Sequence, residues 1–340
     1  MDPAHRETDK KLAQLEEELR IMYAQAEQEV EEKLNDYMRR FEIKDKTWKR
    51  WVETGVRTQD EYIEWRKGQI MMGKRWEEMR DTLAQDLTNV DQIARSTING
   101  YMPEVYAINH NYGTYTMEKG AGVDTSYTLY SRSTVQRMIR DNPQLLPAPR
   151  IDIPKDLRWN SQHIQNAVLQ GIVQGEPIAK IATRLQGVTD MDRKAAIRNA
   201  RTAITGAENA GRLDSWKRGA EMGIKTRKCW IAVLDRRTRS SHRMMDGVTV
   251  DLDENFPNGL ERPGDPAGDP EEVYNCRCSM ISQHEGFEID VKDLSLRSNN
   301  LGDMTYEEWL VAKPEYRDIR AQEKTAERIK QQYINEYRSL

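Results

Sequence analysis

The segment from Trp230 to Cys278 reads WIAVLDRRTRSSHRMMDGVTVDLDENFPNGLERPGDPAGDPEEVYNCRC and gathers residue types that are scattered elsewhere in the chain. Short runs of alternating apolar residues predict strands at 228–234, 248–250 and 276–281. The acidic stretch between residues 251 and 272 is rich in Pro and Gly, which predicts an irregular loop. The segment therefore indicates a small β-containing module, which we place at residues 228–285.

Long amphipathic helices are predicted on the N-terminal side of this module. Apolar residues recur at three- and four-residue spacing from Lys11 to Phe41, which indicates one helix packed on its own chain or on another subunit. Thr58-Gln-Asp-Glu61 has the form of a capping box and opens a second helix that reaches about Ile93. Gly100 and Pro103 are expected to interrupt this helix, and residues 112–130, with three glycines, are expected to form a loop.

Further helices are expected on both sides of the β-containing module. Before the module, helices are expected at 133–140, from a cap at Asn160 to about Gly175, from Pro177 to Gly187, and at 191–222. After it, helices are expected at 306–312, capped by Thr305, and in the charged segment after Pro314. The fold class predicted is therefore mainly α with a small α+β module. We divide the chain into a long-helix region at 1–150, a helical part at 151–227, the β-containing part at 228–285 and a helical tail at 286–340.

Composition limits the classes of protein. The chain has 340 residues, of which 37% are hydrophobic and 32% charged, a balance that favours long solvated helices over one large globule. No apolar run approaches the roughly 18 residues of a membrane span, and the first residues lack the apolar core of a signal peptide. We therefore expect synthesis in the cytoplasm, where the three cysteines stay reduced.

Residues 164–281 carry a family resemblance. Its upstream half is Gly171-Ile-Val-Gln-Gly175, Ile178, Ile181-Ala-Thr-Arg-Leu185, Ala200-Arg201-Thr202 and Asn209. Its downstream half is Trp230, Asp235, Arg237-Thr238-Arg239, His242, Asp246-Gly247, Phe256, Pro263 and Asn275-Cys276-Arg277-Cys278. In this order the fragments resemble the phage Mu F-like head morphogenesis family, also called minor capsid proteins.

The resemblance implies a minor head protein of a tailed phage, found in the virion at the portal vertex or in the head interior. Such proteins act in head assembly, DNA packaging or genome delivery, and are present in the host cytoplasm during assembly. The implied partners are the portal and/or the major capsid protein, and packaged double-stranded DNA through phosphate contacts. Nothing is carried over onto the first 150 residues.

Candidate metal ligands are concentrated in the module. Many relatives place Cys-x-x-Cys where this chain has Arg239-Ser-Ser-His242, so part of the family's pattern is replaced here. Cys229, His242, Cys276 and Cys278 would together supply the Cys₃His ligands of a structural zinc site. The alternative is that the cysteines are small buried apolar residues and His242 a hydrogen-bonded core residue. No other cofactor and no catalytic residue is predicted.

Three functions compete. The first is a structural and interaction protein of the phage head, and the chain is then not an enzyme. The second is a metal-dependent nuclease or toxin-like effector carried in the head, with Asp235 and His242 as its candidate general-base pair. The third is a DNA-binding module, because residues 190–243 hold fourteen Lys or Arg against six Asp or Glu. The same basic residues could instead form ion pairs with the acidic loop at 251–272.

Overall fold

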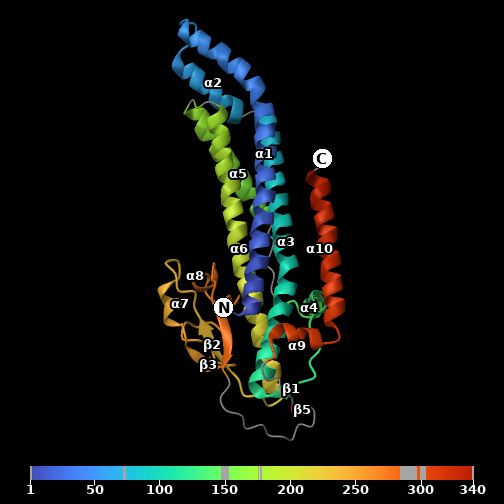
Figure 1. The fold of residues 1–340 in the computed structure, drawn as a ribbon. Helices are drawn as coiled ribbons and strands as arrows, with labels where there is room; N and C mark the ends of the chain where they lie inside the picture. The colour runs from blue at the N-terminus through green and yellow to red at the C-terminus, as the bar shows by residue number, and fades with distance from the viewer. Residues whose placement is uncertain are drawn as a thin grey trace. The chain divides into compact units, whose positions relative to one another are not determined.

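A computed structural model describes residues 2–71, 74–146, 153–174, 176, 178–283, 297–298 and 304–338. The fold is mainly α-helical with a small antiparallel sheet, as predicted (Figure 1). The chain forms two compact units. The first consists of Met1–Ala13, Asn99–Ala148 and Arg201–Leu340, and the second of Gln14–Ile98 and Pro149–Ala200. Both units are discontinuous in sequence, and the four consecutive regions expected from the sequence stay a prediction.

The helices are α1 (Pro3–Glu53), α2 (Gln59–Met71), α3 (Lys74–Ala121), α4 (Arg132–Asp141), α5 (Ile153–Val173), α6 (Ile178–Glu221), α7 (Ser240–Met244), α8 (Pro270–Val273), α9 (Tyr306–Ala312) and α10 (Tyr316–Arg338). The strands are β1 (Val123–Asp124), β2 (Arg227–Ile231), β3 (Thr249–Asp251), β4 (Ser279–Gln283) and β5 (Arg297–Ser298). Among the described residues, none of these helices is long and apolar enough to cross a membrane.

The second unit is a helical bundle whose apolar core runs along α1, α3, α5 and α6. Leu34, Leu83, Ile164 and Ile181 are fully buried in this core. The capping box predicted at the start of α2 is confirmed: Thr58 N–H donates to the Glu61 carboxylate at 2.9 Å, and Glu61 N–H donates to Thr58 Oγ1 at 3.1 Å. The 3.6-residue periodicity of the sequence therefore identified the buried face correctly in this unit.

The predicted interruption of α3 is wrong. The helix continues through Gly100 and Pro103 to Ala121, so the first ten residues of the expected loop are helical. Residues on either side of the proline are buried, including Val105 and Tyr106. Their packing offsets the hydrogen bond that a proline removes from a helix, a loss of roughly 3 kcal/mol. Gly113 is not a loop residue either, since a Cβ there would collide with the Ser215 side chain on α6.

Two further boundaries differ from the prediction. The expected stop at Gly187 does not occur, because α6 is one continuous helix from Ile178 to Glu221. Asn160 lies inside α5 and does not cap it. Its side-chain amide donates to Thr88 Oγ1 at 3.1 Å, so its hydrogen bond joins two helices of the second unit. Pro177, expected in the first turn of a helix, lies outside the described residues.

The three-stranded sheet of the first unit has the order β3-β2-β4 with both pairs antiparallel. Trp230 pairs with Met280, and both side chains enter the core beneath the sheet. The strand expected to begin at Cys276 begins only at Ser279. The carbonyls of Cys276 and Cys278 accept hydrogen bonds from α6 side chains, so this segment is held by a helix before it joins the sheet.

Candidate metal-binding group

His242, Cys276 and Cys278 come together in the first unit although 34 residues separate the first two. Helix α7 carries His242, and the irregular segment just before β4 carries both cysteines. Nδ1 of His242 lies 3.6 Å from Sγ of Cys276 and 3.4 Å from Sγ of Cys278. Candidate ligand atoms of the three residues all lie within 4.8 Å of one another. All three residues are buried, so the group is closed to bulk solvent.

A carboxylate lies on the other side of the imidazole. Nε2 of His242 is 3.0 Å from a carboxylate oxygen of Glu272, at the third position of the short helix α8. Ser241 Oγ donates to the same carboxylate at 3.0 Å and fixes its position. Metal-ligating histidines usually have such a carboxylate on the nitrogen that does not bind the metal. The arrangement therefore directs Nδ1 of His242 towards the two sulfurs.

The two thiols are coupled. A hydrogen bond between Cys276 and Cys278 lowers the pKa of Cys278 and raises that of Cys276, and the His242 ring adds to the lowering at Cys278. One sulfur is thus stabilised as a thiolate next to a neutral thiol. A thiolate is the form in which cysteine binds metals, so the chemistry of this donor set suits a soft or borderline cation such as Zn²⁺.

Cys229, the fourth residue of the predicted site, is not part of this group. It lies on β2 next to Trp230, whose ring packs edge-on against His242 at a centroid distance of 5.3 Å. Successive side chains of a strand point to opposite faces of the sheet, so Cys229 faces away from the histidine. The described residues supply three of the four ligands that a structural zinc site requires.

Arg277 stands between the two cysteines in the sequence and pairs with a carboxylate. Its guanidinium forms two hydrogen bonds with Asp235, at 2.7 and 2.8 Å, and these bonds hold the pKa of that carboxyl below its usual range. Asp235 is therefore engaged by Arg277, whereas His242 is engaged by Glu272. The structure does not bring Asp235 and His242 together as a general-base pair.

Helix α6 anchors the cysteine segment through one face. Thr205, Glu208, Asn209 and Arg212 are spaced so that they share this face, and all four are buried. Thr205 Oγ1 donates to the Cys276 carbonyl at 2.7 Å, and the Asn209 amide donates to the Cys278 carbonyl at 3.1 Å. Asn209 is one of the residues that carry the sequence resemblance, and its amide holds the backbone at Cys278.

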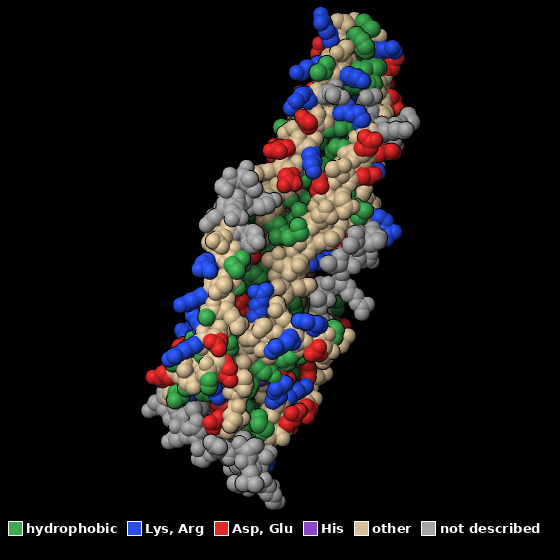
Figure 2. Space-filling view, turned by 90° about the vertical axis from the view of Figure 1, so that its right-hand side faces the viewer, with side chains coloured by type: hydrophobic (Ala, Val, Ile, Leu, Met, Phe, Trp, Pro, Cys, Tyr) green, Lys and Arg blue, Asp and Glu red, His purple; other side chains and the backbone are tan. Residues whose placement is uncertain are grey.

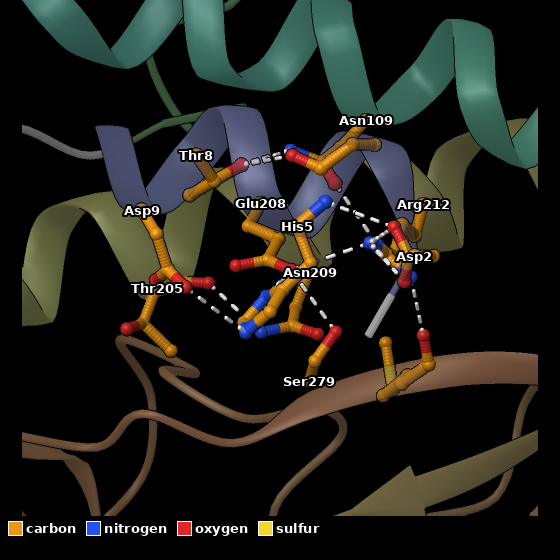
Figure 3. Close-up of polar contacts among 12 residues, drawn as sticks. Asp2, His5, Thr8, Asp9, Asn109, Thr205, Glu208, Asn209, Arg212 and Ser279 are labelled. Atoms are coloured by element: carbon orange, nitrogen blue, oxygen red, sulfur yellow. Dashed lines mark hydrogen bonds and ion pairs between the residues drawn. The ribbon is translucent and has the colours of Figure 1, made fainter. Parts of the chain in front are cut away.

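The same face of α6 carries a buried charge network with the start of the chain (Figure 3). Nδ1 of His5 lies 2.6 Å from Glu208 Oε1, which also accepts a hydrogen bond from Ser279 at 3.0 Å. Arg212 donates to Asn109 Oδ1 at 3.0 Å and to the Met280 carbonyl at 2.9 Å. The apolar periodicity predicts a helix only from Lys11 onward, so it gives no indication of His5, whereas α1 begins at Pro3. A lone histidine near the terminus gave no periodic signal.

A known protein family matches the part of the chain that contains this group. Residues 162–281 match the family described as Phage Mu protein F like protein. The matched segment includes the anchoring face of α6, strands β2 and β3, the first part of β4, and His242, Cys276 and Cys278. This match confirms the resemblance to the Phage Mu F-like family that the sequence predicted for this part of the chain.

Similar curated proteins include the minor head protein GP7 of Bacillus phage SPP1, 28% identical over 255 residues that cover 71% of this chain and 79% of GP7. The NAD(+)--arginine ADP-ribosyltransferase EFV of Enterococcus faecalis is 27% identical over 220 residues, which cover 63% of this chain and 44% of that protein. An uncharacterized protein of Haemophilus influenzae is 28% identical over 64% of this chain and 45% of its own length. This chain thus spans less than half of the last two proteins. No solved structure matches.

Proposed function

We propose that this chain is a minor head protein of a tailed phage that acts in head morphogenesis. The observation that carries the proposal is the similarity to the SPP1 minor head protein, which extends over most of both chains and well beyond the Mu F-like segment. The finer proposal is that the chain lies at the portal vertex or in the head interior, bound to the portal and/or the major capsid protein, and assists packaging or delivery of DNA. The long helices with charged, solvated faces supply the surface for such contacts.

Genetic complementation tests this function. An amber mutation in the codon of Lys11 should lower the yield of infectious particles, and supply of the intact chain in trans should restore it. Mass spectrometry of purified virions should then detect the chain, and mild disruption should leave it with the portal. Normal heads and normal titre without the chain would contradict the proposal. Virion association without the portal would contradict only the portal contact.

Contact with DNA would require basic side chains that are not already paired within the chain. Figure 2 shows Lys and Arg side chains interspersed with Asp and Glu on the face it presents. Two basic residues of the 190–243 segment pair with the acidic loop: Lys217 with Glu261 at 2.7 Å, and Arg227 with Asp251 at 2.8 Å. These pairs favour neutralisation within the chain. Binding of duplex DNA whose affinity falls steeply with salt would support a phosphate contact, and weak, salt-insensitive binding would argue against it.

We further propose that the chain is not an enzyme. Asp235 pairs with Arg277, and His242 pairs with Glu272. Because Asp235 and His242 do not pair with each other as a general base and its carboxylate would, this arrangement supports the proposal. The alternatives are a metal-dependent nuclease and, from the name of the enterococcal relative, an arginine ADP-ribosyltransferase. Incubation of the purified chain with NAD⁺ and an arginine-rich acceptor, and separately with duplex DNA and Mg²⁺ or Zn²⁺, distinguishes these activities. Turnover in either assay would overturn the proposal.

We also propose that His242, Cys276 and Cys278 supply three of the ligands of a structural Zn²⁺, whose fourth ligand is not among the metal-ligating residues grouped in the described part of the chain. Their separation, their burial and the carboxylate behind the imidazole support the assignment. A bound zinc would join α7 to the segment before β4, and the chain's own residues already hold both elements in place. The competing interpretation, that the three residues are ordinary core residues, predicts a protein that folds without metal.

A further inference from the structure

Arginines are concentrated in the segment that follows strand β2, at residues 235–243. Its sequence, DRRTRSSHR, contains four arginines and one acidic residue. Arg236, Arg237 and Arg243 are exposed, and the fold brings Arg277 to the same place from the segment before β4. We call residues 235–243 together with Arg277 the arginine surface. It lies entirely within the first unit.

Three guanidinium groups of the arginine surface meet at a single aspartate. Arg277 donates to both carboxylate oxygens of Asp235, at 2.7 and 2.8 Å. Nε of Arg237 lies 3.7 Å from Oδ2 of the same carboxylate, and Nη2 of Arg243 donates to the Asp235 carbonyl at 2.6 Å. Each guanidinium group carries five N–H donors, so Arg237 and Arg243 are held at one end and keep donors for a further acceptor.

The chain itself does not neutralise the arginine surface. Arg236, Arg239 and Arg243 form no ion pair with a carboxylate among the residues that the structure describes. Arg239 donates to a backbone carbonyl instead, that of Tyr274. Asp235 is thus the carboxylate that this group of guanidinium groups shares. Such an excess of positive charge attracts an anionic partner.

Acidic residues of the neighbouring segments do not remove this excess. Glu272 lies 3.0 Å from Nε2 of His242, and Asp246 accepts a hydrogen bond from the Ala232 N–H at 2.9 Å. In the described part of the chain, neither of them nor Glu271 forms an ion pair with an arginine. The carboxylates near the arginine surface therefore hold an imidazole and a backbone group, and the arginines stay available to another molecule.

Large apolar side chains are exposed beside the arginines. Leu234, directly before the arginine surface, is 66% exposed, and Met244, directly after residue 243, is 69% exposed. Tyr274, whose carbonyl accepts from Arg239, is 45% exposed. Single exposed apolar residues are ordinary, whereas several in one place mark an interaction site. Arginine, tyrosine and methionine are also residue types that are enriched in protein interfaces.

This combination favours a protein partner over a nucleic acid. A phosphodiester backbone could accept from the guanidinium groups, but it would leave Leu234 and Met244 in water because it offers no apolar surface. A protein segment with both carboxylates and apolar side chains would satisfy both kinds of residue. Arginine binds a carboxylate through two parallel hydrogen bonds, and the pair of Arg277 and Asp235 already shows this geometry.

We propose that the arginine surface, with Leu234, Met244 and Tyr274 beside it, docks onto an acidic segment of another protein of the phage head. The proposal rests on the proposed role in the phage head and adds the surface through which the chain binds its partner. Carboxylates of the partner would pair with Arg237 and Arg243. Its apolar side chains would cover the three exposed ones.

Site-specific photo-crosslinking of the full chain in infected cells tests the surface. The probe p-benzoylphenylalanine in place of Met244 should cross-link to one head protein of the same phage, through a peptide that contains Asp or Glu beside apolar residues. The same probe in place of Val311 is the control. Val311 is 66% exposed and lies on α9, outside the arginine surface, so it should give no such product.

Charge reversal measures how much the surface contributes. Arg243→Glu should lower the number of copies per virion about tenfold, because it removes a pair and adds a like charge at the contact. The matched control Arg317→Glu, at an exposed arginine of α10, should enter virions as the parent does. Circular dichroism establishes whether each variant folds. If Arg243→Glu does not fold, Met244→Ser takes its place, since Met244 is exposed.

The outcomes separate the surface from the role in the head. Cross-links to DNA alone or to host proteins alone would overturn the docking proposal. Incorporation of Arg243→Glu and Met244→Ser at the level of the parent would overturn it as well, and would leave the role in the head intact. Absence of the parent chain from virions would overturn both proposals.

Discussion

The guanidinium of Arg212 donates to both carboxylate oxygens of Asp2, at 2.9 and 3.0 Å, across 210 residues of sequence. The arginine side chain is 1% exposed and also lies 3.3 Å from Glu208. A buried cation with two carboxylates is stable only while all partners are present, since each ion has lost its hydration. Arg212 is therefore the centre of the polar network in the first unit.

Replacement of Arg212 by Met should strongly destabilise the protein. The variant leaves Glu208 and Asp2 without their cation, and removing one partner of a buried pair costs about 3–5 kcal/mol. Urea unfolding monitored by circular dichroism measures the change. The control is Arg39→Met, whose side chain is 76% exposed and which should change stability by less than about 0.5 kcal/mol. Similar effects of the two substitutions would contradict the importance of the network.

Stability should fall as pH rises above neutrality because of His5. Burial lowers the pKa of His5, but its hydrogen bond and charge interaction with Glu208 outweigh burial, and the net pKa is raised above the ordinary 6.5. The stabilisation from protonated His5 is fully present below about pH 6.5 and is lost as pH rises through the higher folded-state pKa. Thermal unfolding between pH 6 and 8.5 should show this loss, and His5→Gln should show less of it. If the unfolding temperatures of the parent and of His5→Gln change with pH in the same way, His5 does not cause the loss of stability.

Zinc content distinguishes a three-ligand group from the four-ligand site expected from the sequence. Elemental mass spectrometry should find about one zinc per chain in the parent and in Cys229→Ser, because Cys229 faces away from His242. The double variant Cys276→Ser/Cys278→Ser should lose the metal and unfold at a lower temperature. A well-folded parent without metal would identify the cysteines as core residues. Loss of zinc in Cys229→Ser would show that Cys229 is a ligand after all.

Close packing of two glycines joins α6 to the Pro263-Gly264-Asp265-Pro266 turn. A Cβ on Gly264 would lie 2.7 Å from the Gly206 backbone nitrogen, and its φ of +73° adds conformational strain. Gly259 has a φ of +83° but open space around its Cα, so it provides a matched control. Gly264→Ala should cost at least about 1 kcal/mol more than Gly259→Ala, whose strain alone is about 1–2 kcal/mol. Equal losses in urea unfolding would show that the turn can move away from the helix.

The periodic sequence signal predicted helices well and their ends poorly. Leu34 and Ile164 lie on apolar stripes and are buried, whereas Gly113 and Pro103 predict breaks but lie within α3. Glycine at a helix–helix contact and glycine in a loop look alike in a sequence. The distinction depends on which atoms of the folded chain lie where a Cβ would be. For Gly113 that neighbour is Ser215, about a hundred residues away along the chain.

The candidate site was predicted in part. His242, Cys276 and Cys278 were identified from their residue types and their order. The exclusion of Cys229 could not be predicted, because it depends on which face of β2 turns towards α7. The role of Glu272 behind the imidazole also had no sequence signal, since Glu272 is one of several acidic residues in its loop.

The bond between Asp2 and Arg212 also bears on the order in which the protein is made. Asp2 and His5 leave the ribosome before most of the chain, whereas Arg212 and Ser279 follow after more than 200 residues. At about 5–20 residues per second, this interval lasts roughly 10–40 s. During that time Asp2 and His5 lack Arg212 and Glu208, and a nascent chain interrupted before β4 keeps an incomplete first unit. Premature products should therefore be cleaved by proteases faster than finished chains.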